Sequence, residues 1–165
     1  MLLPTRGSPQ VHPDTRFGVR VRNKAEQTIT TDVLTTLSWD VVDYNRGLMF
    51  QLHRDQQRLI CRIPGVFHGV ASISWVAEAT GYRRVDVTID RPDSTNDIAG
   101  SNTVTAVSGI RTQQNCVWHG EFRIGDTLLV KVAHSRGSDL NIQASSTGTP
   151  VLEATYVRPL EPRIS

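Results

Sequence analysis

The feature that most constrains this sequence is the alternation of apolar and polar residues in short runs. Between residues 17 and 157 the runs are separated by glycine, proline, asparagine and aspartate, and none shows the spacing of an amphipathic helix. Successive side chains of a β-strand point to opposite faces, so these runs predict strands that bury one face. Their number predicts an all-β chain, an antiparallel two-sheet sandwich of about ten strands.

The clearest strands are expected at residues 66–76 and 82–90. In the second of these, Val85, Val87 and Ile89 share one face, and charged or hydroxyl-bearing residues alternate with them. Further strands are expected at residues 18–22, 35–40, 48–52, 58–63, 104–110, 115–122, 127–134, 139–142 and 151–157. The polar stretches 90–97 and 145–148 are expected to be exposed loops.

The length of 165 residues fits one domain that buries a full core without disulfides or metals. Residues 1–16 contain three prolines and no periodicity, which predicts an extended N-terminal arm before a domain at 17–157 and a C-terminal tail at 158–165. Cys61 and Cys116 belong to no CxxC motif, so two buried free thiols are expected.

Charge and hydropathy exclude some partners. A formal net charge of +2 does not favour nucleic acid. No apolar run approaches the roughly 18 residues of a membrane span. The first residues lack the basic and apolar regions of a secretory signal, so synthesis in a cytoplasm without a signal peptide is expected.

Four short motifs occur in order: Trp-Asp-Val-Val-Asp-Tyr-Asn at residues 39–45, Ile-Pro-Gly-Val-Phe at 63–67, Ala-Thr-Gly-Tyr-Arg-Arg at 79–84 and Gly-Asp-Thr-Leu at 125–128. Over residues 17–157 the chain thereby resembles the globular head of complement component 1q and its tumour-necrosis-factor-like relatives. The resemblance implies a ten-stranded jelly roll that packs as a homotrimer.

The same resemblance implies structural roles for the motifs. Residues 43–45 match the turn before the second strand pair. Pro64 and Gly65 match the turn into the long core strand, and Gly125 and Asp126 match the turn into the seventh or eighth strand.

The chain departs from the animal members of this family because it has no collagen-like repeats and no secretory signal. The stalkless form resembles versions found in bacteriophage particles and on bacterial surfaces. The leading hypothesis is therefore a non-enzymatic structural protein on the surface of a phage virion. Its position would be the tail tip or fibre, as a minor tail protein that can bind a host receptor, or the capsid, as a decorating or cementing protein.

The arm would attach the trimer to other virion proteins, and its anchoring residues are expected to be Leu2, Leu3, Pro4 and Val11. The alternative hypothesis is a lectin-like carbohydrate-binding module of a bacterial or phage surface protein, with a host-surface glycan as ligand. A third class, a metal-dependent jelly-roll enzyme, predicts a bound transition metal.

Candidate residues for the trimer interface or for binding are Trp39, Arg83, Arg84 and Tyr156. An exposed Trp39 would stack on a sugar ring, whereas a buried one would belong to the core. Consecutive strand residues point to opposite faces, so only one of the two arginines can be exposed on a given face. An ion pair between subunits is the preferred interpretation.

No catalytic motif for hydrolysis, phosphate binding or dinucleotide binding is present, so no enzyme activity and no cofactor are expected. His119 and Glu121 would share a strand face, as metal ligands must, but a surface polar pair is favoured. Asp90, Asp93 and Asp97 could hold Ca²⁺, although their spacing does not match a calcium loop and a solvated loop is favoured.

Overall fold

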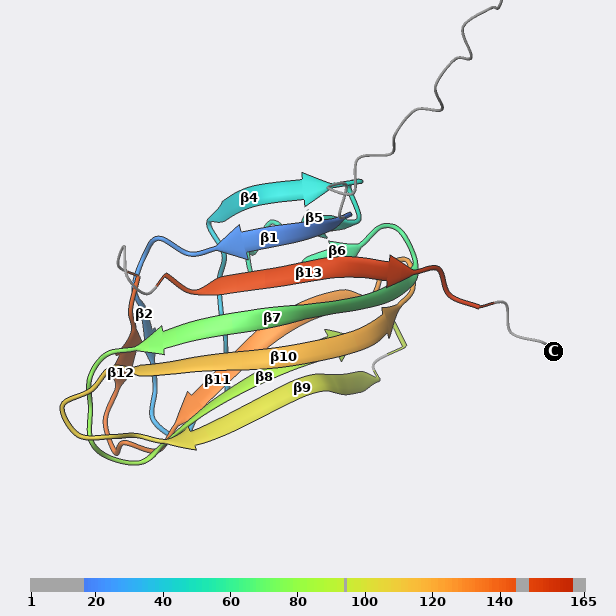
Figure 1. Ribbon diagram of the computed structural model, residues 1–165. Helices are drawn as coiled ribbons and strands as arrows, with labels where there is room; N and C mark the ends of the chain where they lie inside the picture. Colours follow the sequence, from blue (N-terminus) through green and yellow to red (C-terminus); the bar gives the residue numbers. More distant parts are fainter. Residues whose placement is uncertain (1–16, 94, 145–148, 162–165) are drawn as a thin grey trace, which may run out of the picture.

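The computed structural model describes residues 17–93, 95–144 and 149–161, and all regular secondary structure in these ranges is β-strand (Figure 1). The thirteen strands are β1 (Gly18–Arg22), β2 (Gln27–Ile29), β3 (Thr35–Thr36), β4 (Val41–Arg46), β5 (Phe50–Leu52), β6 (Leu59–Cys61), β7 (Gly65–Trp75), β8 (Tyr82–Asp90), β9 (Asn96–Thr105), β10 (Thr112–Phe122), β11 (Thr127–His134), β12 (Leu140–Ile142) and β13 (Val151–Arg158). None of the described segments is a helix long and apolar enough to cross a bilayer.

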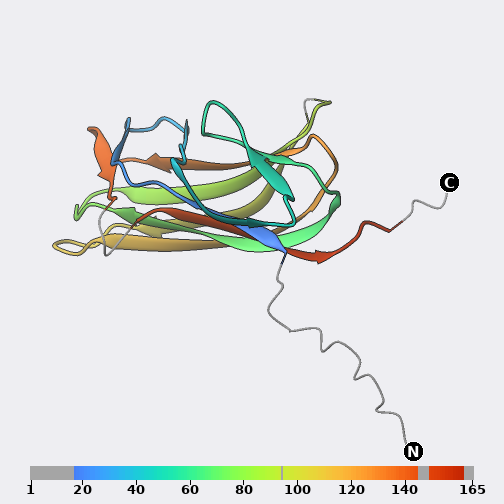
Figure 2. The ribbon, with the colours of Figure 1, turned by 90° about the horizontal axis from the view of Figure 1, so that it is seen from above.

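The strands form two antiparallel sheets that lie as two layers (Figure 2). Sheet A has the order β2-β12-β7-β13-β1-β4, with β10 also paired to β7. Sheet B has the order β5-β6-β11-β8-β9, with β3 paired to β11. The longest ladder joins β7 to β10 over eleven residue pairs, from Gly65↔Phe122 to Trp75↔Thr112. This ladder fixes which side chains of the two strands lie side by side.

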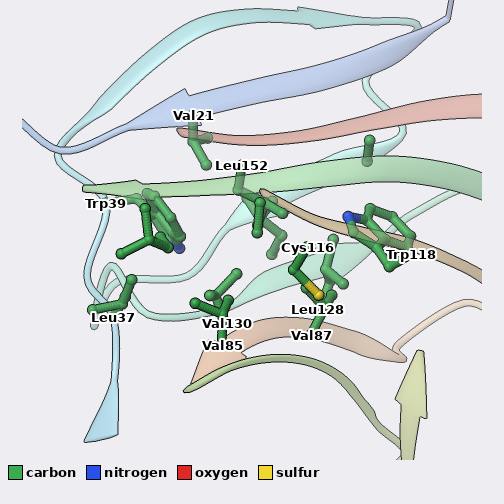
Figure 3. Packing of buried hydrophobic residues seen from close by; sticks show 14 of the residues in the cluster. Val21, Leu37, Trp39, Val85, Val87, Cys116, Trp118, Leu128, Val130 and Leu152 are labelled. Carbon is green, nitrogen blue, oxygen red and sulfur yellow. The ribbon is translucent and has the colours of Figure 1, made fainter. Parts of the chain in front are cut away.

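One hydrophobic core fills the space between the sheets, as Figure 3 shows. Sheet A contributes Val21 and Leu152 together with Trp118, and sheet B contributes Val85 and Leu128. All five side chains are at most 1 % exposed. The alternation seen in the sequence therefore places every second side chain in the core. Burial of these apolar side chains is the main source of stability in a sandwich of this size.

The strands with the strongest alternation match their expected positions. β1, β8 and β11 have the predicted bounds, and β7 and β13 differ by one residue at their ends. The turn predicted at residues 125–126 is also present. Gly125 has a φ of +90°, and the Asp126 carboxylate accepts a hydrogen bond from the Arg123 backbone at 2.8 Å.

The expected count of ten strands is wrong, because the structure has thirteen in its described residues. The prediction missed β2, β4 and β9, all of which lie at sheet edges. An edge strand is paired on one side only and tolerates polar residues on both faces, which removes the alternation. Residues 43–45 thus belong to strand β4 and do not form the expected turn.

The prediction of a strand at residues 104–110 is also wrong. β9 begins at Asn96, inside the stretch expected to be a loop, and ends at Thr105. The chain then turns, with Gly109 at a φ of +71°. The strand expected at 35–40 is reduced to β3, Thr35–Thr36. The proposed anchoring residues of the arm lie outside the described residues.

Candidate functional site

The outer face of sheet A carries the most exposed apolar side chain of the described residues. Val117, on β10, is 76 % exposed, whereas its strand neighbours Cys116 and Trp118 are buried in the core. The register places Val117 opposite Val70 on β7, and Val70 opposite Glu153 on β13. We call the outward side chains of β7, β10 and β13 the A face. Its centre is apolar and has no covering element from the described chain.

The A face becomes ionic toward β1 and β4. Arg22 donates to the Asp43 carboxylate at 2.7 Å, and the Tyr44 hydroxyl donates to Glu153 at 2.9 Å. Burial, with a further contribution from the Glu153 carboxylate, raises the pKa of Tyr44 to about 12, so this hydroxyl remains protonated and continues to donate. The apolar part of the face is therefore limited to the half formed by β7 and β10.

The edge strand β9 adds one exposed apolar side chain next to the A face. Ile98 is 61 % exposed, and it lines a hollow of about 430 Å³ together with Val66, His119, Glu121 and Arg158. Among described residues β9 forms a ladder with β8 alone, and β10 lies along its other side, where the Asn102 amide donates to the Asn115 carbonyl oxygen at 3.1 Å. Ile98 and the outward residues of β10 thus line the same hollow.

Arg83 and Arg84 have separate environments, as the alternation required. Arg83 is 0 % exposed and donates to the carbonyl oxygens of Thr80 and Tyr82, both at 2.9 Å. Its guanidinium carbon also lies 5.8 Å from the centre of the Trp75 ring. The interface role expected for Arg83 is wrong, because the side chain is fully covered by its own chain and holds the segment before β8.

Arg84 points outward and pairs with the carboxylate of Asp86 at 2.7 Å. Asp86 is itself buried and also accepts from Ser101 at 2.7 Å. The ion pair expected between subunits is thus made within one chain. The Arg84 side chain is still 42 % exposed and thus accessible to a partner.

Replacing Arg83 with methionine is expected to lower the free energy of unfolding by about 2 kcal/mol, because it leaves buried carbonyl oxygens without donors. Chemical denaturation at a fixed protein concentration measures this change. Arg62→Met, on an exposed side chain, is the matched control and should stay within about 0.5 kcal/mol. Equal stability of the two variants would contradict the structural role of Arg83.

All three tryptophans are buried, at 1 % exposure or less. Trp39 therefore belongs to the core, and the exposed stacking role considered for it is wrong. Trp75 donates its ring N–H to Gln114 at 2.7 Å inside the core. The lectin-like alternative thus has no tryptophan platform. Tyr156 is half-buried, with its ring 5.4 Å from that of Phe67, so its position permits partial contact with a partner.

The acidic loop between β8 and β9 uses its carboxylates within the protein. Arg91 pairs with both Asp97 and Asp126, and Asp93 accepts hydrogen bonds from Thr95. The described residues contain no group of three or more histidine, cysteine, aspartate or glutamate side chains placed to hold a metal ion. These aspartates are therefore not gathered into the calcium loop considered from the sequence.

Cys61 and Cys116 are both buried and unpaired, which confirms the expected free thiols. Burial raises the pKa of the Cys61 thiol to about 12 and raises that of Cys116 as well. A thiol is nucleophilic only when it is deprotonated. Neither cysteine is therefore suited to catalysis.

The sequence predicts that His119 and Glu121 share a strand face, but it does not predict the residue opposite His119. In the β7–β10 ladder His119 lies directly opposite His68. Both side chains are exposed on the A face. The alternation of buried and exposed residues in the sequence predicts that both histidines point outward. Their pairing depends on the register of β7 and β10, two strands that are far apart along the chain.

Comparison with known proteins identifies the fold. No protein-family model and no curated protein matches the sequence. Among solved structures, the chain is similar to Eiger TNF from S. frugiperda, with a TM-score of 0.64 and 11 % identity over 91 % of this chain and 98 % of that one. It is also similar to murine APRIL at pH 8.0, with a TM-score of 0.63 and 13 % identity over 85 % and 98 % of the two chains.

The globular domain of zebrafish complement 1qA protein gives a TM-score of 0.61 and 11 % identity over 88 % of this chain and all of that one. At such low identity the likeness concerns the fold alone. These structures and the two antiparallel sheets together show that the chain has the all-β jelly-roll fold shared by tumour necrosis factors and complement 1q heads.

Proposed function

We propose that this protein is a non-enzymatic assembly protein that forms a homotrimer through the A face. The observation that carries the proposal is the apolar centre of that face, Val117 and Val70, together with the exposed Ile98 of β9. Exposed apolar surface of this kind marks interaction sites. The resemblance to complement 1q heads implies the same assembly.

The Val117 centre and the Ile98 side of β9 are two different surfaces, so they suit a head-to-tail contact between copies. The Ile98 edge of one copy would pack on the Val117 centre of the next. A contact between two different surfaces closes into a ring when the rotation between copies divides a full turn. Three copies would close the ring and cover each A face.

Replacing Val117 with arginine is expected to reduce the mass in solution from near three times 18.3 kDa to near 18.3 kDa. The reason is that the contact would bury a guanidinium without a partner, which is strongly unfavourable. Light scattering on the purified variant measures the mass. Leu48→Arg is the control, because Leu48 is 73 % exposed in the β4–β5 connection and should leave the trimer intact.

We further propose that the trimer is displayed on a bacteriophage particle, in the tail tip or fibre or on the capsid. The support is the resemblance of residues 79–84 to phage-type members of the complement 1q-like group. The arm at residues 1–16 would attach the trimer to other virion proteins, after synthesis in the host cytoplasm.

Antibody labelling of purified particles in the electron microscope tests this setting. Label at the tail or on the capsid is the expected result, and its loss after deletion of residues 1–16 would locate the attachment in the arm. Particles without the protein would contradict the proposal, whatever the mass in solution.

A further inference from the structure

His68 and His119 form a cross-strand pair on the A face. They are directly opposite each other in the antiparallel β7–β10 ladder. Their strand neighbours Phe67 and Trp118 are buried, so both imidazoles point outward. The Cβ atoms of directly opposed residues are about 4.5–5.5 Å apart. Neither imidazole has a hydrogen bond or ion pair with another described residue.

This spacing suits a metal ion bound by both rings. Zinc lies about 2.0–2.1 Å from an imidazole nitrogen, so two nitrogens on a tetrahedral zinc ion are about 3.3 Å apart. Side chains whose Cβ atoms are this close reach that separation by rotation about χ1 and χ2. Neutral imidazole suits zinc, copper and nickel, whereas calcium and magnesium prefer oxygen ligands.

We infer that His68 and His119 form a two-imidazole site for a divalent transition metal such as Zn²⁺. Because the described residues hold no larger cluster of metal-binding side chains, the remaining positions are open to water or to a donor from another molecule. Both ligands come from one chain, so the site does not require the homotrimer. Within a homotrimer it would lie on the contact face, where a second copy could complete the coordination.

Calorimetric titration of the metal-free full chain with Zn²⁺, and separately with Ni²⁺, tests the inference. The expected result is one metal ion per chain. Either His68→Gln or His119→Gln should weaken binding by at least about tenfold, because each leaves a single imidazole. His53→Gln is the control, since His53 lies after β5 beside Asp55, and it should bind as the wild type does.

The inference is overturned if the wild-type chain binds neither metal, if either variant binds as tightly as the wild type, or if the His53 variant loses as much. Light scattering of each sample separates this result from the proposed assembly. A trimer that binds no zinc rejects the metal site alone, whereas a monomer that binds zinc supports the site and rejects the homotrimer.

Discussion

Replacing Gly69 with alanine is expected to separate β7 from β13 and to lower the free energy of unfolding by at least about 3 kcal/mol, the upper end of overpacking costs. A Cβ atom at this position would overlap the backbone carbonyl of Glu153 and lie 2.6 Å from the Trp118 ring. A backbone oxygen held in a sheet cannot rotate away, so the strands themselves would have to move. Denaturation with urea at a fixed protein concentration measures the loss.

Gly120→Ala is the matched control on the neighbouring strand. There the nearest atom is the terminal methyl of Ile89, which can change rotamer, so the expected cost is about 1 kcal/mol. Equal destabilisation by Gly69→Ala and Gly120→Ala would contradict this prediction. It would show that the close approach of β13 does not exclude a Cβ atom at position 69.

Phe67→Ala is expected to lower the free energy of unfolding by about 3–5 kcal/mol. Phe67 is 0 % exposed, and its ring lies 4.9 Å from Phe50, 5.5 Å from Phe122 and 5.4 Å from Tyr156. The substitution creates a cavity and removes three edge-to-face contacts, of which the one to Phe50 joins the two sheets.

Phe17→Ala is the control for this prediction, because Phe17 is largely exposed and should change stability by less than about 1 kcal/mol. Protein concentration must be held constant, since dissociation of an oligomer contributes to the measured stability. If Phe67→Ala lowers the free energy of unfolding by less than Phe17→Ala does, the position of Phe67 at the centre of the aromatic cluster is contradicted.

The central strands could be predicted from the sequence because their environment is simple. Val85, Val87 and Ile89 face one core, so alternation alone determines the bounds of β8. Strands β4 and β9 lie at sheet edges, and none of their residues is buried, so no strict alternation of apolar and polar residues is required. Without that alternation, the intrinsic preference of aspartate and asparagine for turns favours a turn at the polar residues of β4.

The candidate site was harder to predict than the core. Arg83 has the same parity as Val85, and that signal places it inside, but the carbonyl groups that hold it come from the segment before β8. The His68–His119 pair depends on the β7–β10 register, which follows from the pairing of distant strands. The alternation shows which side chains face outward and does not show which of them meet.

The assembly of copies through the A face is tested most directly by the molar mass of the full chain in solution, measured by light scattering and repeated after deletion of residues 1–16. We expect a mass near three times 18.3 kDa in both samples, because the proposed contact lies in the folded domain and not in the arm. A mass near 18.3 kDa in both samples would contradict the homotrimer.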